Sequence, residues 1–192
     1  MPRFLEIIIS LAGLILLSPI LILIAVLIPL ESKGPIFFRA RRVGREEKTF
    51  LMWKFRTMVA DAETKGPAIT TKWDARITAL GTILRKTKLD ELPQLINVLA
   101  GDMGFVGPRP EDPGIVRRYT QTQKKIFRYR PGITSPASII FRAEEEMISP
   151  GKWEEVYLNG ILPKKLETDL RYMERATMWS DIKIIFKTIF DK

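Results

Sequence analysis

Residues 7–30 read IIISLAGLILLSPILILIAVLIPL, and none of them carries a charge. A helix of this length is long enough to cross a hydrocarbon core about 30 Å thick. Its density of Leu and Ile argues against a helix buried inside a soluble domain. Glu6 interrupts the basic region that a secretory signal peptide needs, and no cleavage signal follows. The stretch therefore predicts a segment in contact with lipid.

The dipeptide Ser18-Pro19 divides this segment into two halves. Proline lacks a backbone donor and clashes with the preceding turn, so we expect a sharp bend there. Each half is too short to cross a bilayer alone. Two interpretations stay open on the residues alone: a kinked helix that spans, and a hairpin that enters and leaves by one face. Basic residues on both flanks, Arg3 and Lys33, favour two cytoplasmic ends.

The middle of the chain predicts a small β-hairpin followed by helices. Residues 36–44 and 48–58 alternate like two strands around a turn. A short helix is expected at 78–84. Apolar residues then recur at helical spacing in 89–99, and Gly101 supplies a C-terminal stop.

The remaining segments are less regular. We expect a mobile loop at 59–72, an irregular loop at 101–110 and a basic helix at 111–129. The closing segment, 179–192, has a single apolar stripe. It is therefore either an interfacial amphipathic helix or a helix packed on the core.

The chain has no cysteine and no histidine, and its formal net charge is +9. These absences exclude disulfides, thiolate nucleophiles, imidazole bases and every Ser-His or Cys-His triad. Chemistry must therefore use carboxylates, lysine, arginine, hydroxyls or a bound metal ion. The positive charge is concentrated in residues 33–56 and 117–130, which is typical of surfaces that bind phosphate or anionic lipid.

Asp90 and Glu91 stand just ahead of Pro93 in the sequence TKLDELPQ (87–94). Helix capping explains both acids, because Asp90 occupies an N-cap position ahead of an apolar run and Glu91 lies in the first turn. A catalytic interpretation explains them as well. Free amides at a helix start bind phosphate, and an ionised carboxylate there can hold Mg²⁺.

Basic residues on separate segments favour the catalytic interpretation. Lys54 ends the second strand, and Arg85 precedes the acids. Arg109 stands alone between Pro108 and Pro110, and a proline-flanked arginine is preorganised for two-pronged contact with phosphate. A lipid-contacting segment, several bases, paired acids and no imidazole together predict phosphoryl chemistry at a membrane surface.

Six segments carry a resemblance to a known family. They are the Ser18-Pro19 break, GPIFFRARRVG (34–44), KFRTM (54–58), RKTKLDELPQLINVLAGDMGFVGPRP (85–110), RPGIT (130–134) and SDIKIIFKT (180–188). In this order they closely resemble the monotopic phosphoglycosyl transferases, also called bacterial sugar transferases. The likeness covers nearly the whole chain, and residues 85–110 are its most specific part.

The resemblance implies transfer of a sugar-1-phosphate from a UDP-sugar to a polyprenol phosphate such as undecaprenyl phosphate, with release of UMP. This reaction is the first membrane step of glycoconjugate synthesis. Asp90 would be the nucleophile that forms a phosphosugar ester, Glu91 would assist, and the pair would position Mg²⁺. Lys54 and Arg85 match positions of positive charge at the phosphates, and Pro108-Arg109-Pro110 matches a nucleotide-binding loop.

The resemblance also implies a location and an organisation. The Ser18-Pro19 break would return the membrane helix to the cytoplasmic face of the bacterial inner membrane. We therefore expect a re-entrant membrane helix at 1–32 and a cytosolic, membrane-associated catalytic domain at 33–192. The expected fold is α+β, with a re-entrant helix-break-helix, a small β-hairpin and a mostly helical domain with interfacial amphipathic helices. The chain looks like the minimal catalytic form of the family.

The expected partners are the UDP-sugar, the polyprenol phosphate, membrane lipid and downstream glycosyltransferases, without nucleic acid. After RPGIT the chain departs from the family pattern with SPASIIFRAEEEM (135–147), a segment that would border the sugar pocket, so the sugar is not indicated.

Two alternatives remain. One is a membrane-bound phosphohydrolase that acts on a nucleotide-sugar or a lipid diphosphate. The other is a membrane-tethered basic protein that binds nucleic acid or anionic lipid without catalysis. A module that binds nucleic acid stacks bases on exposed aromatic side chains. Here Trp53, Phe55 and Phe105 fit buried positions equally well, which argues against this second alternative.

Overall fold

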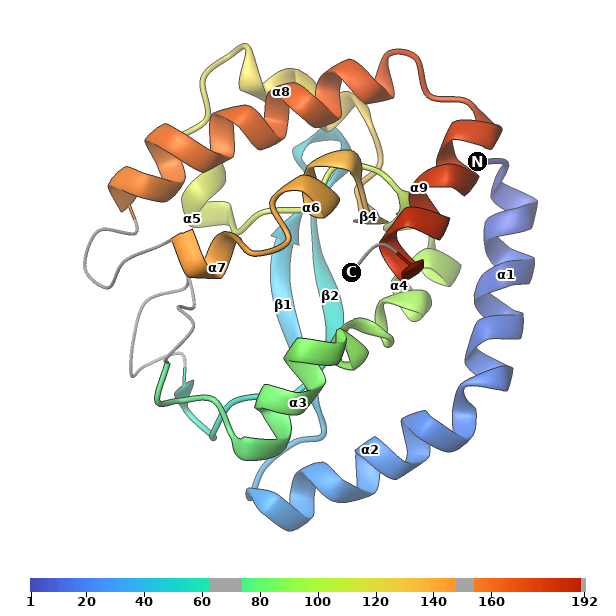
Figure 1. Ribbon diagram of the computed structural model, residues 1–192, viewed down its shortest axis with the longest axis vertical. Helices are drawn as coiled ribbons and strands as arrows, with labels where there is room; N and C mark the ends of the chain where they lie inside the picture. The colour runs from blue at the N-terminus through green and yellow to red at the C-terminus, as the bar shows by residue number, and fades with distance from the viewer. Residues whose placement is uncertain (63–73, 148–153, 191–192) are drawn as a thin grey trace.

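The computed structural model describes residues 1–62, 74–147 and 154–190. Figure 1 shows a central hairpin of two strands with helices around it and a bent pair of helices along one side. Helices dominate the described part, and its strands form two small two-stranded sheets. The predicted mixture of a small sheet with a mostly helical domain is confirmed. Of the loop expected at 59–72, residues 63–72 lie outside the described residues.

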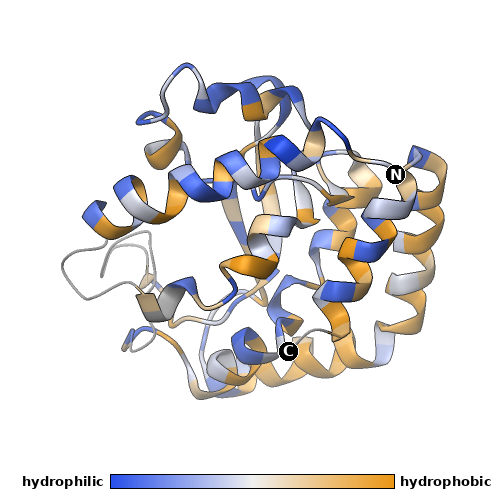
Figure 2. Ribbon diagram, turned by 45° about the horizontal axis from the view of Figure 1, so that its top comes forward, coloured by the Kyte–Doolittle hydropathy of each residue, from blue (hydrophilic) through white to orange (hydrophobic). Residues whose placement is uncertain are grey.

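The apolar segment forms two helices, α1 (Arg3–Leu16) and α2 (Ser18–Glu31), with a bend of 61° between them. Pro19 lies in the first turn of α2, where its missing N–H is tolerated, and the Ser18 hydroxyl donates to the carbonyl of Ile15 at 2.8 Å. Within the described part of the chain, no single helix is long and apolar enough to cross a membrane, whereas the bent pair together is, by length and composition. Figure 2 shows hydrophobic residues along both helices.

Hydrogen bonds at both ends of the bent pair, α1 and α2, hold it against the rest of the protein. Glu6 is buried in α1 and accepts a hydrogen bond from Arg130 at 2.8 Å. At the other end, the guanidinium of Arg56 donates to the carbonyls that follow α2, those of Ser32 and Lys33. Charged side chains therefore fix how the pair lies against the domain.

The predicted hairpin is present as β1 (Phe37–Val43) and β2 (Thr49–Phe55), joined through the 3-10 turn η1 (Arg45–Glu47). Side chains alternate across a strand. Ala40 and Met52 thus point to one face, where they pack with buried side chains from residues 98 and 103.

The helical segment after the hairpin has three parts: α3 (Ala79–Thr87), the 3-10 turn η3 (Leu89–Glu91) and α4 (Gln94–Ala100). Lys88 breaks the first helix with a left-handed φ of 58°, and Gly101 ends the last with a φ of 93°. The predicted helices at 78–84 and 89–99 are confirmed. The second begins as a 3-10 turn because Pro93 has no N–H to donate to the previous turn.

The prediction of a wholly irregular loop at 101–110 was wrong. The loop contains a short strand, β3 (Gly104–Val106), which pairs in parallel with β4 (Gly132–Thr134). Glycine permits this contact, because a Cβ on Gly132 would lie 2.1 Å from the backbone nitrogen of Gly107. A three-residue strand is too short to show alternation in a sequence.

The prediction of one basic helix at 111–129 was also wrong. The segment breaks into a short α-helix, α5 (Pro113–Val116), and a 3-10 helix, η4 (Gln123–Arg128). Thr120 and Gln123 explain the break, because each side chain accepts a hydrogen bond from the backbone N–H of the other. Such local bonds give the backbone an alternative to a continuous helix.

The chain then continues through α6 (Pro136–Ile140), α7 (Glu144–Met147), the π-helical turn η5 (Glu154–Ile161), α8 (Leu162–Met173) and α9 (Met178–Phe190). α8 covers a large apolar core to which η4, η5 and α5 contribute. α9 lies beside α1 (Figure 1) and turns Trp179, Phe186 and Phe190 outward, each more than half exposed. This exposure favours the interfacial alternative for α9 over core packing.

Candidate active site

Two basic side chains from separate segments converge on Glu91. Lys54, near the end of β2, places its ammonium nitrogen 2.8 Å from Glu91 Oε1. Arg109, from the loop after β3, places Nη2 2.6 Å from the same oxygen and Nη1 3.4 Å from Oε2. Three residues that the sequence assigned to one site therefore meet in space.

The ion pairs fix the charge of Glu91. Burial raises the pKa of Glu91, but Arg109 and Lys54 outweigh burial and hold that pKa well below its ordinary value. The charge of Glu91 in turn raises the pKa of Arg109. Burial lowers the pKa of Lys54, and Glu91 only partly opposes that shift. Glu91 is thus ionised at neutral pH.

Asp90 is buried, and its Oδ1 has no hydrogen-bond partner among the described residues. An N-cap would accept a bond from a backbone N–H two or three residues later, but neither η3 nor α4 has a side-chain cap. The capping interpretation of Asp90 is therefore wrong. Burial raises its pKa, Lys54 lowers it and Glu91 raises it again, with a net increase. Unsatisfied buried carboxylates with perturbed pKa values are concentrated at functional sites.

Arg85 reaches the same place from the last turn of α3. Its Nε donates to the hydroxyl of Thr57 at 3.0 Å, and its charge acts on the Asp90 carboxylate. α3 can approach the end of β2 this closely because Gly81 has no side chain. A Cβ there would lie 2.1 Å from the carbonyl oxygen of Thr57.

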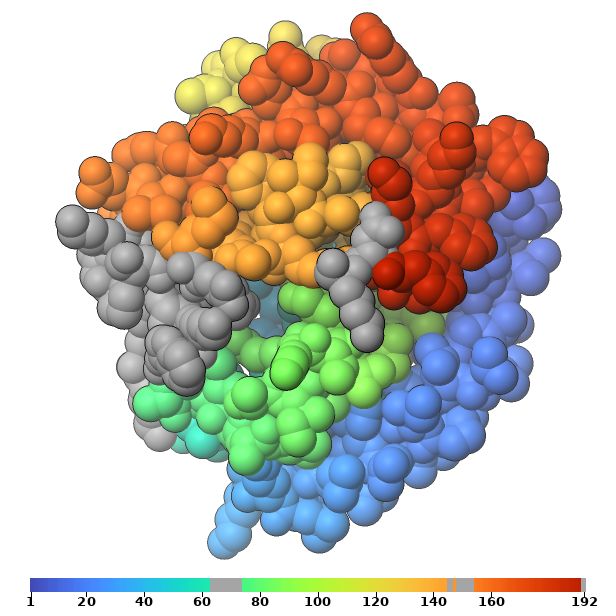
Figure 3. Space-filling view, viewed as in Figure 1, coloured from blue at the N-terminus to red at the C-terminus, as the bar shows by residue number. Residues whose placement is uncertain are grey.

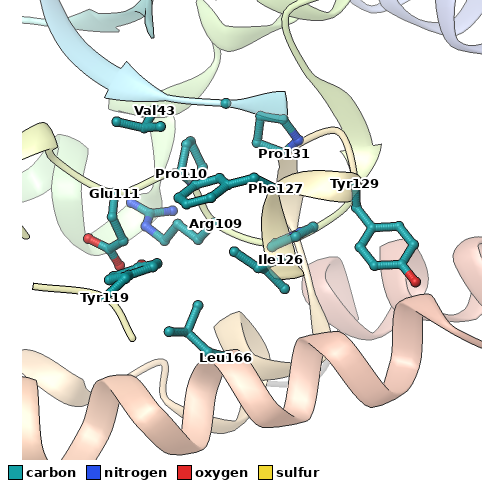
Figure 4. A pocket seen from close by; sticks show the side chains of 12 residues that line it. Val43, Arg109, Pro110, Glu111, Tyr119, Ile126, Phe127, Tyr129, Pro131 and Leu166 are labelled. Atoms are coloured by element: carbon teal, nitrogen blue, oxygen red, sulfur yellow. The ribbon is translucent and has the colours of Figure 1, made fainter. Parts of the chain in front are cut away.

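The pairing of β3 with β4 positions the Pro108-Arg109-Pro110 loop. The backbone N–H of Gly132 donates to the carbonyl of Pro108 at 3.1 Å. Figure 4 shows Arg109 and Pro110 in a narrow crevice together with Glu111, Tyr119, Ile126 and Phe127. Backbone bonds and an apolar wall thus hold the loop so that the guanidinium reaches Glu91.

Two predicted residues lie elsewhere in the fold. Ser18 and Pro19 form the bend between α1 and α2. They determine the bend of the backbone between the two helices. The hydrogen bonds to Glu91 come from Lys54 and Arg109 instead.

Sequence reasoning missed Asn97, which fixes α4 against β2. Its Nδ2 donates to the carbonyl of Leu51 at 2.8 Å, and its Oδ1 accepts from the N–H of Trp53 at 2.9 Å. These bonds set how the turn that carries Glu91 lies against the strand that carries Lys54. A signal was present, because Asn97 is a polar residue within the apolar helical run of 89–99.

A buried network behind the Arg109 loop was also missed. Lys165 on α8 lies 2.7 Å from the Glu144 carboxylate and 3.4 Å from the hydroxyl of Tyr157. That hydroxyl donates to Glu111 at 2.5 Å. The network joins the segment that departs from the family pattern to the residue after Pro110. No local sequence pattern predicts it, because its members come from four separate segments.

The carboxylate oxygens of Asp90 and Glu91 are ligand atoms of the kind that a hard cation prefers. Asp90 has an unbonded carboxylate oxygen, and Glu91 adds a second carboxylate. Mg²⁺ is usually bound by one or two carboxylates together with substrate phosphates. Over residues 1–62, 74–147 and 154–190, no three acidic, His or Cys side chains form a group that could hold a metal ion. An ion at Asp90 and Glu91 would therefore need a phosphorylated substrate to complete its ligands.

Open space is found next to these segments. Figure 3 shows the surface hollowed between the green segment of α3 and α4 and the gold segment of α6 and α7. A separate cavity of about 190 Å³ lies between the bent pair and the site elements. Its lining is apolar throughout: Leu14, Leu21, Ile22, Ala25, Phe37, Phe55, Pro93 and Ile96.

Comparison of the chain with protein-family models and with known sequences identifies its family. Residues 1–191 match the model of the family described as bacterial sugar transferase. Over 189 residues the chain is 38% identical to the UDP-glucose:undecaprenyl-phosphate glucose-1-phosphate transferase of Escherichia coli (strain K12), covering 96% of this chain and 38% of that protein.

Two further relatives carry related names. The chain is 34% identical over 195 residues to the UDP-N-acetylgalactosamine-undecaprenyl-phosphate N-acetylgalactosaminephosphotransferase of Aeromonas hydrophila, with 97% of this chain and 42% of that protein covered. It is 42% identical over 130 residues to a putative undecaprenyl-phosphate N-acetylgalactosaminyl 1-phosphate transferase of Bacillus subtilis (strain 168), with 68% and 72% covered. The chain thus spans about two fifths of the length of the first two relatives.

Proposed function

The chain belongs to the bacterial sugar transferase family, and we propose on this premise that it transfers a sugar-1-phosphate from a UDP-sugar to undecaprenyl phosphate or a similar polyprenol phosphate. UMP is released, and the product enters polysaccharide or other glycan synthesis. The substrates in the names of the relatives support this class of donor and acceptor. The observation that carries the proposal is the buried Asp90 carboxylate, which has an unbonded oxygen and lies within reach of the charges of Lys54 and Arg85.

In the first half-reaction Asp90 acts as the nucleophile. One carboxylate oxygen attacks the phosphorus that bears the sugar, an acyl phosphate bond forms, and the bond to UMP breaks with the electron pair leaving on UMP. Phosphoryl transfer requires in-line placement and neutralisation of charge more than it requires proton transfer. Lys54, Arg85 and Arg109 supply positive charge, so the reaction needs no histidine.

In the second half-reaction a phosphate oxygen of the polyprenol phosphate attacks the same phosphorus. The bond to Asp90 breaks, and the aspartate leaves as a carboxylate, which restores the enzyme. Dividing the reaction in this way lets one site serve a soluble donor and a lipid acceptor in turn.

Asp90 and Glu91 are the residues that would hold Mg²⁺ together with the phosphates of the substrate. When bound, the ion neutralises negative charge that develops on the phosphoryl oxygens. The Pro108-Arg109-Pro110 loop binds the nucleotide, with the guanidinium of Arg109 directed at its phosphates.

The bent pair and α9 bind the membrane from its cytoplasmic face, with α1 and α2 re-entrant and α9 interfacial. The bend of 61° and the exposed apolar side chains of all three helices support this placement. The apolar cavity between the bent pair and Pro93 is where we expect the first isoprene units of the acceptor, since it lies between the lipid-facing helices and the turn that carries Asp90.

UMP release measured over a panel of UDP-sugars, with undecaprenyl phosphate present, tests the proposal. Asp90→Asn should abolish UMP release and leave membrane association intact, while Glu167→Gln on the exposed face of α8 serves as the control. Protein incubated with the donor alone should show the mass of a phosphosugar on the peptide that contains Asp90. An active Asp90→Asn protein, or an unmodified peptide during turnover, would overturn the assignment of the nucleophile.

The same assay separates a transferase from a phosphohydrolase. A transferase releases one equivalent of UMP and then needs the polyprenol phosphate for further turnover. Continued UMP release at full rate without the acceptor would identify water as the acceptor instead.

A further inference from the structure

The side-chain amide nitrogen of Gln94 is buried near the turn that carries Asp90 and lacks a hydrogen-bond partner among the described residues. Gln94 is the first residue of α4 and is 1% exposed. Its Nε2 has no hydrogen-bond partner in the part of the chain that the structure describes. Because an unpaired buried amide destabilises a fold, the presence of such a group requires an explanation.

The direction in which Gln94 points follows from its helix. Residues three apart lie on the same face of a helix, and Asn97 bonds to the backbone of β2 at Leu51 and Trp53. Gln94 therefore also faces β2, one turn nearer to η3. It lies on the side of α4 that faces the strand carrying Lys54, next to the turn that carries Asp90.

Asp90 offers the matching group. Its Oδ1 is a buried acceptor without a donor, and Nε2 of Gln94 is a buried donor without an acceptor. The two residues lie one helical turn apart, and they are not bonded to each other in this structure. A change of side-chain torsion angles, or one bridging water molecule, would join them.

The other charged groups that act on Asp90 come from three elements. Lys54 on β2 is engaged by Glu91, and Arg85 on α3 is engaged by Thr57. Lys88 and Glu91 belong to the same turn as Asp90. Among these groups and Gln94, only the amide is a neutral donor, so it can orient the carboxylate without adding charge to the site.

We propose that Gln94 is a positioning residue for the nucleophile: its Nε2 donates to Oδ1 of Asp90, directly or through one water molecule, and so presents Oδ2 to the phosphorus. The inference rests on the proposed function, in which Asp90 attacks the donor. A neutral amide that holds one oxygen leaves the other free, and a fixed carboxylate reacts faster than one that rotates.

Gln94→Met tests this role, because methionine keeps a similar length and volume but cannot donate. We expect kcat for UMP formation to fall about tenfold or more, with an unchanged KM for the UDP-sugar. The melting temperature should stay the same or rise, because the variant removes an unpaired buried amide. Gln121→Met, at an exposed position, is the matched control.

A packing role for Gln94 gives a different result. Loss of packing would lower the melting temperature and would leave kcat per folded molecule unchanged, and that outcome overturns the proposal, as does a fully active Gln94→Met protein. If Gln94→Met does not fold, Gln94→Leu decides, since leucine is of similar volume and cannot donate. Wild-type kcat in Gln94→Leu overturns the proposal, and a loss with unchanged KM supports it.

Failure of the proposed function is visible separately. In that case wild-type protein releases no UMP, or Asp90→Asn remains active, whatever Gln94 variants do. When the wild type is active and the Asp90→Asn protein is inactive, an outcome that overturns the proposal refutes the role of Gln94 alone.

Discussion

The guanidinium of Arg109 lies 2.6 Å from the Glu91 carboxylate, and the ammonium of Lys54 lies 2.8 Å from the same oxygen. One carboxylate therefore faces two cations, and a net positive charge remains. A diphosphate can bind there with part of its charge compensated. The ion pairs also hold Arg109 in place, so that binding does not have to order a free side chain.

Arg109→Ala should raise the KM for the UDP-sugar about tenfold to a hundredfold, because charge-assisted hydrogen bonds contribute roughly 1.5–3 kcal/mol. kcat should change less, since Arg109 binds the nucleotide rather than the attacking group. Initial rates over a range of donor concentrations measure both parameters. Arg117→Ala, at an exposed position, is the control. An unchanged KM in Arg109→Ala would remove Arg109 from the nucleotide site.

Gly81→Ala should displace α3, because a Cβ at this position would lie 2.1 Å from the carbonyl oxygen of Thr57. Overpacking of this kind destabilises a protein by about 1–3 kcal/mol. Because Arg85 on the same helix acts on Asp90, kcat/KM should fall as well. Gly160→Ala is the matched control, since a Cβ on Gly160 would meet nothing within 4 Å. Equal melting temperatures for the two variants would contradict this account.

The sequence predicted the hairpin, the bend at Ser18-Pro19 and the α3–α4 segment because each has a local cause. Alternation marks β1 and β2, proline marks the bend, and Gly101 marks the end of α4. The site residues were grouped by the chemistry of their side chains and by the resemblance. Their convergence on Glu91 depends on long-range packing of β2 and the β3 loop, which periodicity does not contain.

The sequence failed where polar side chains compete with backbone structure or lack a partner. The Thr120–Gln123 bonds break the helix expected at 111–129. Asp90 has the residue type and position of an N-cap, yet its Oδ1 accepts no bond from the described residues. A capping preference is a tendency of a residue type, and a functional site can override it.

Ala25→Trp should fill the apolar cavity between the bent pair and Pro93. If the acceptor places its first isoprene units there, the KM for undecaprenyl phosphate should rise severalfold or more. The first half-reaction should be unchanged, because it needs only the donor. UMP formed in a single turnover without acceptor, compared with steady-state turnover, separates the two steps.

Val26→Trp provides the control for Ala25→Trp. Val26 is the next residue on α2 and is 53% exposed, so a bulky side chain there points away from the cavity. Equal KM values for the acceptor in both variants would show that the cavity does not take the lipid. A slower first half-reaction in Ala25→Trp would instead indicate that the substitution disturbs the turn that carries Asp90.

Asp169 should make stability depend on pH. It is buried on α8, its Oδ1 accepts from the N–H of Ala137 at 2.9 Å, and burial raises its pKa to about 6, partly opposed by hydrogen bonds from Ala137 and Ser135. The pKa of an unfolded Asp is about 3.9. The folded protein therefore binds the proton more tightly, so this contribution is fully present below about pH 4 and is lost as pH rises through about 6.

Asp169→Asn should remove this dependence, because Asn keeps an acceptor for Ala137 and does not ionise. The difference in unfolding free energy between the variant and the wild type should shift in favour of the variant by on the order of 2–3 kcal/mol as the pH rises from 4 to 7.5. Thermal or chemical unfolding of both proteins at the two pH values measures the change, with Glu167→Gln on the exposed face of α8 as the control. A difference between wild type and Asp169→Asn that is the same at both pH values would mean that Asp169 does not titrate in this window. The carboxylate would then have to be stabilised in its ionised form, and Lys165, whose charge lowers the pKa of Asp169, is the residue to test next.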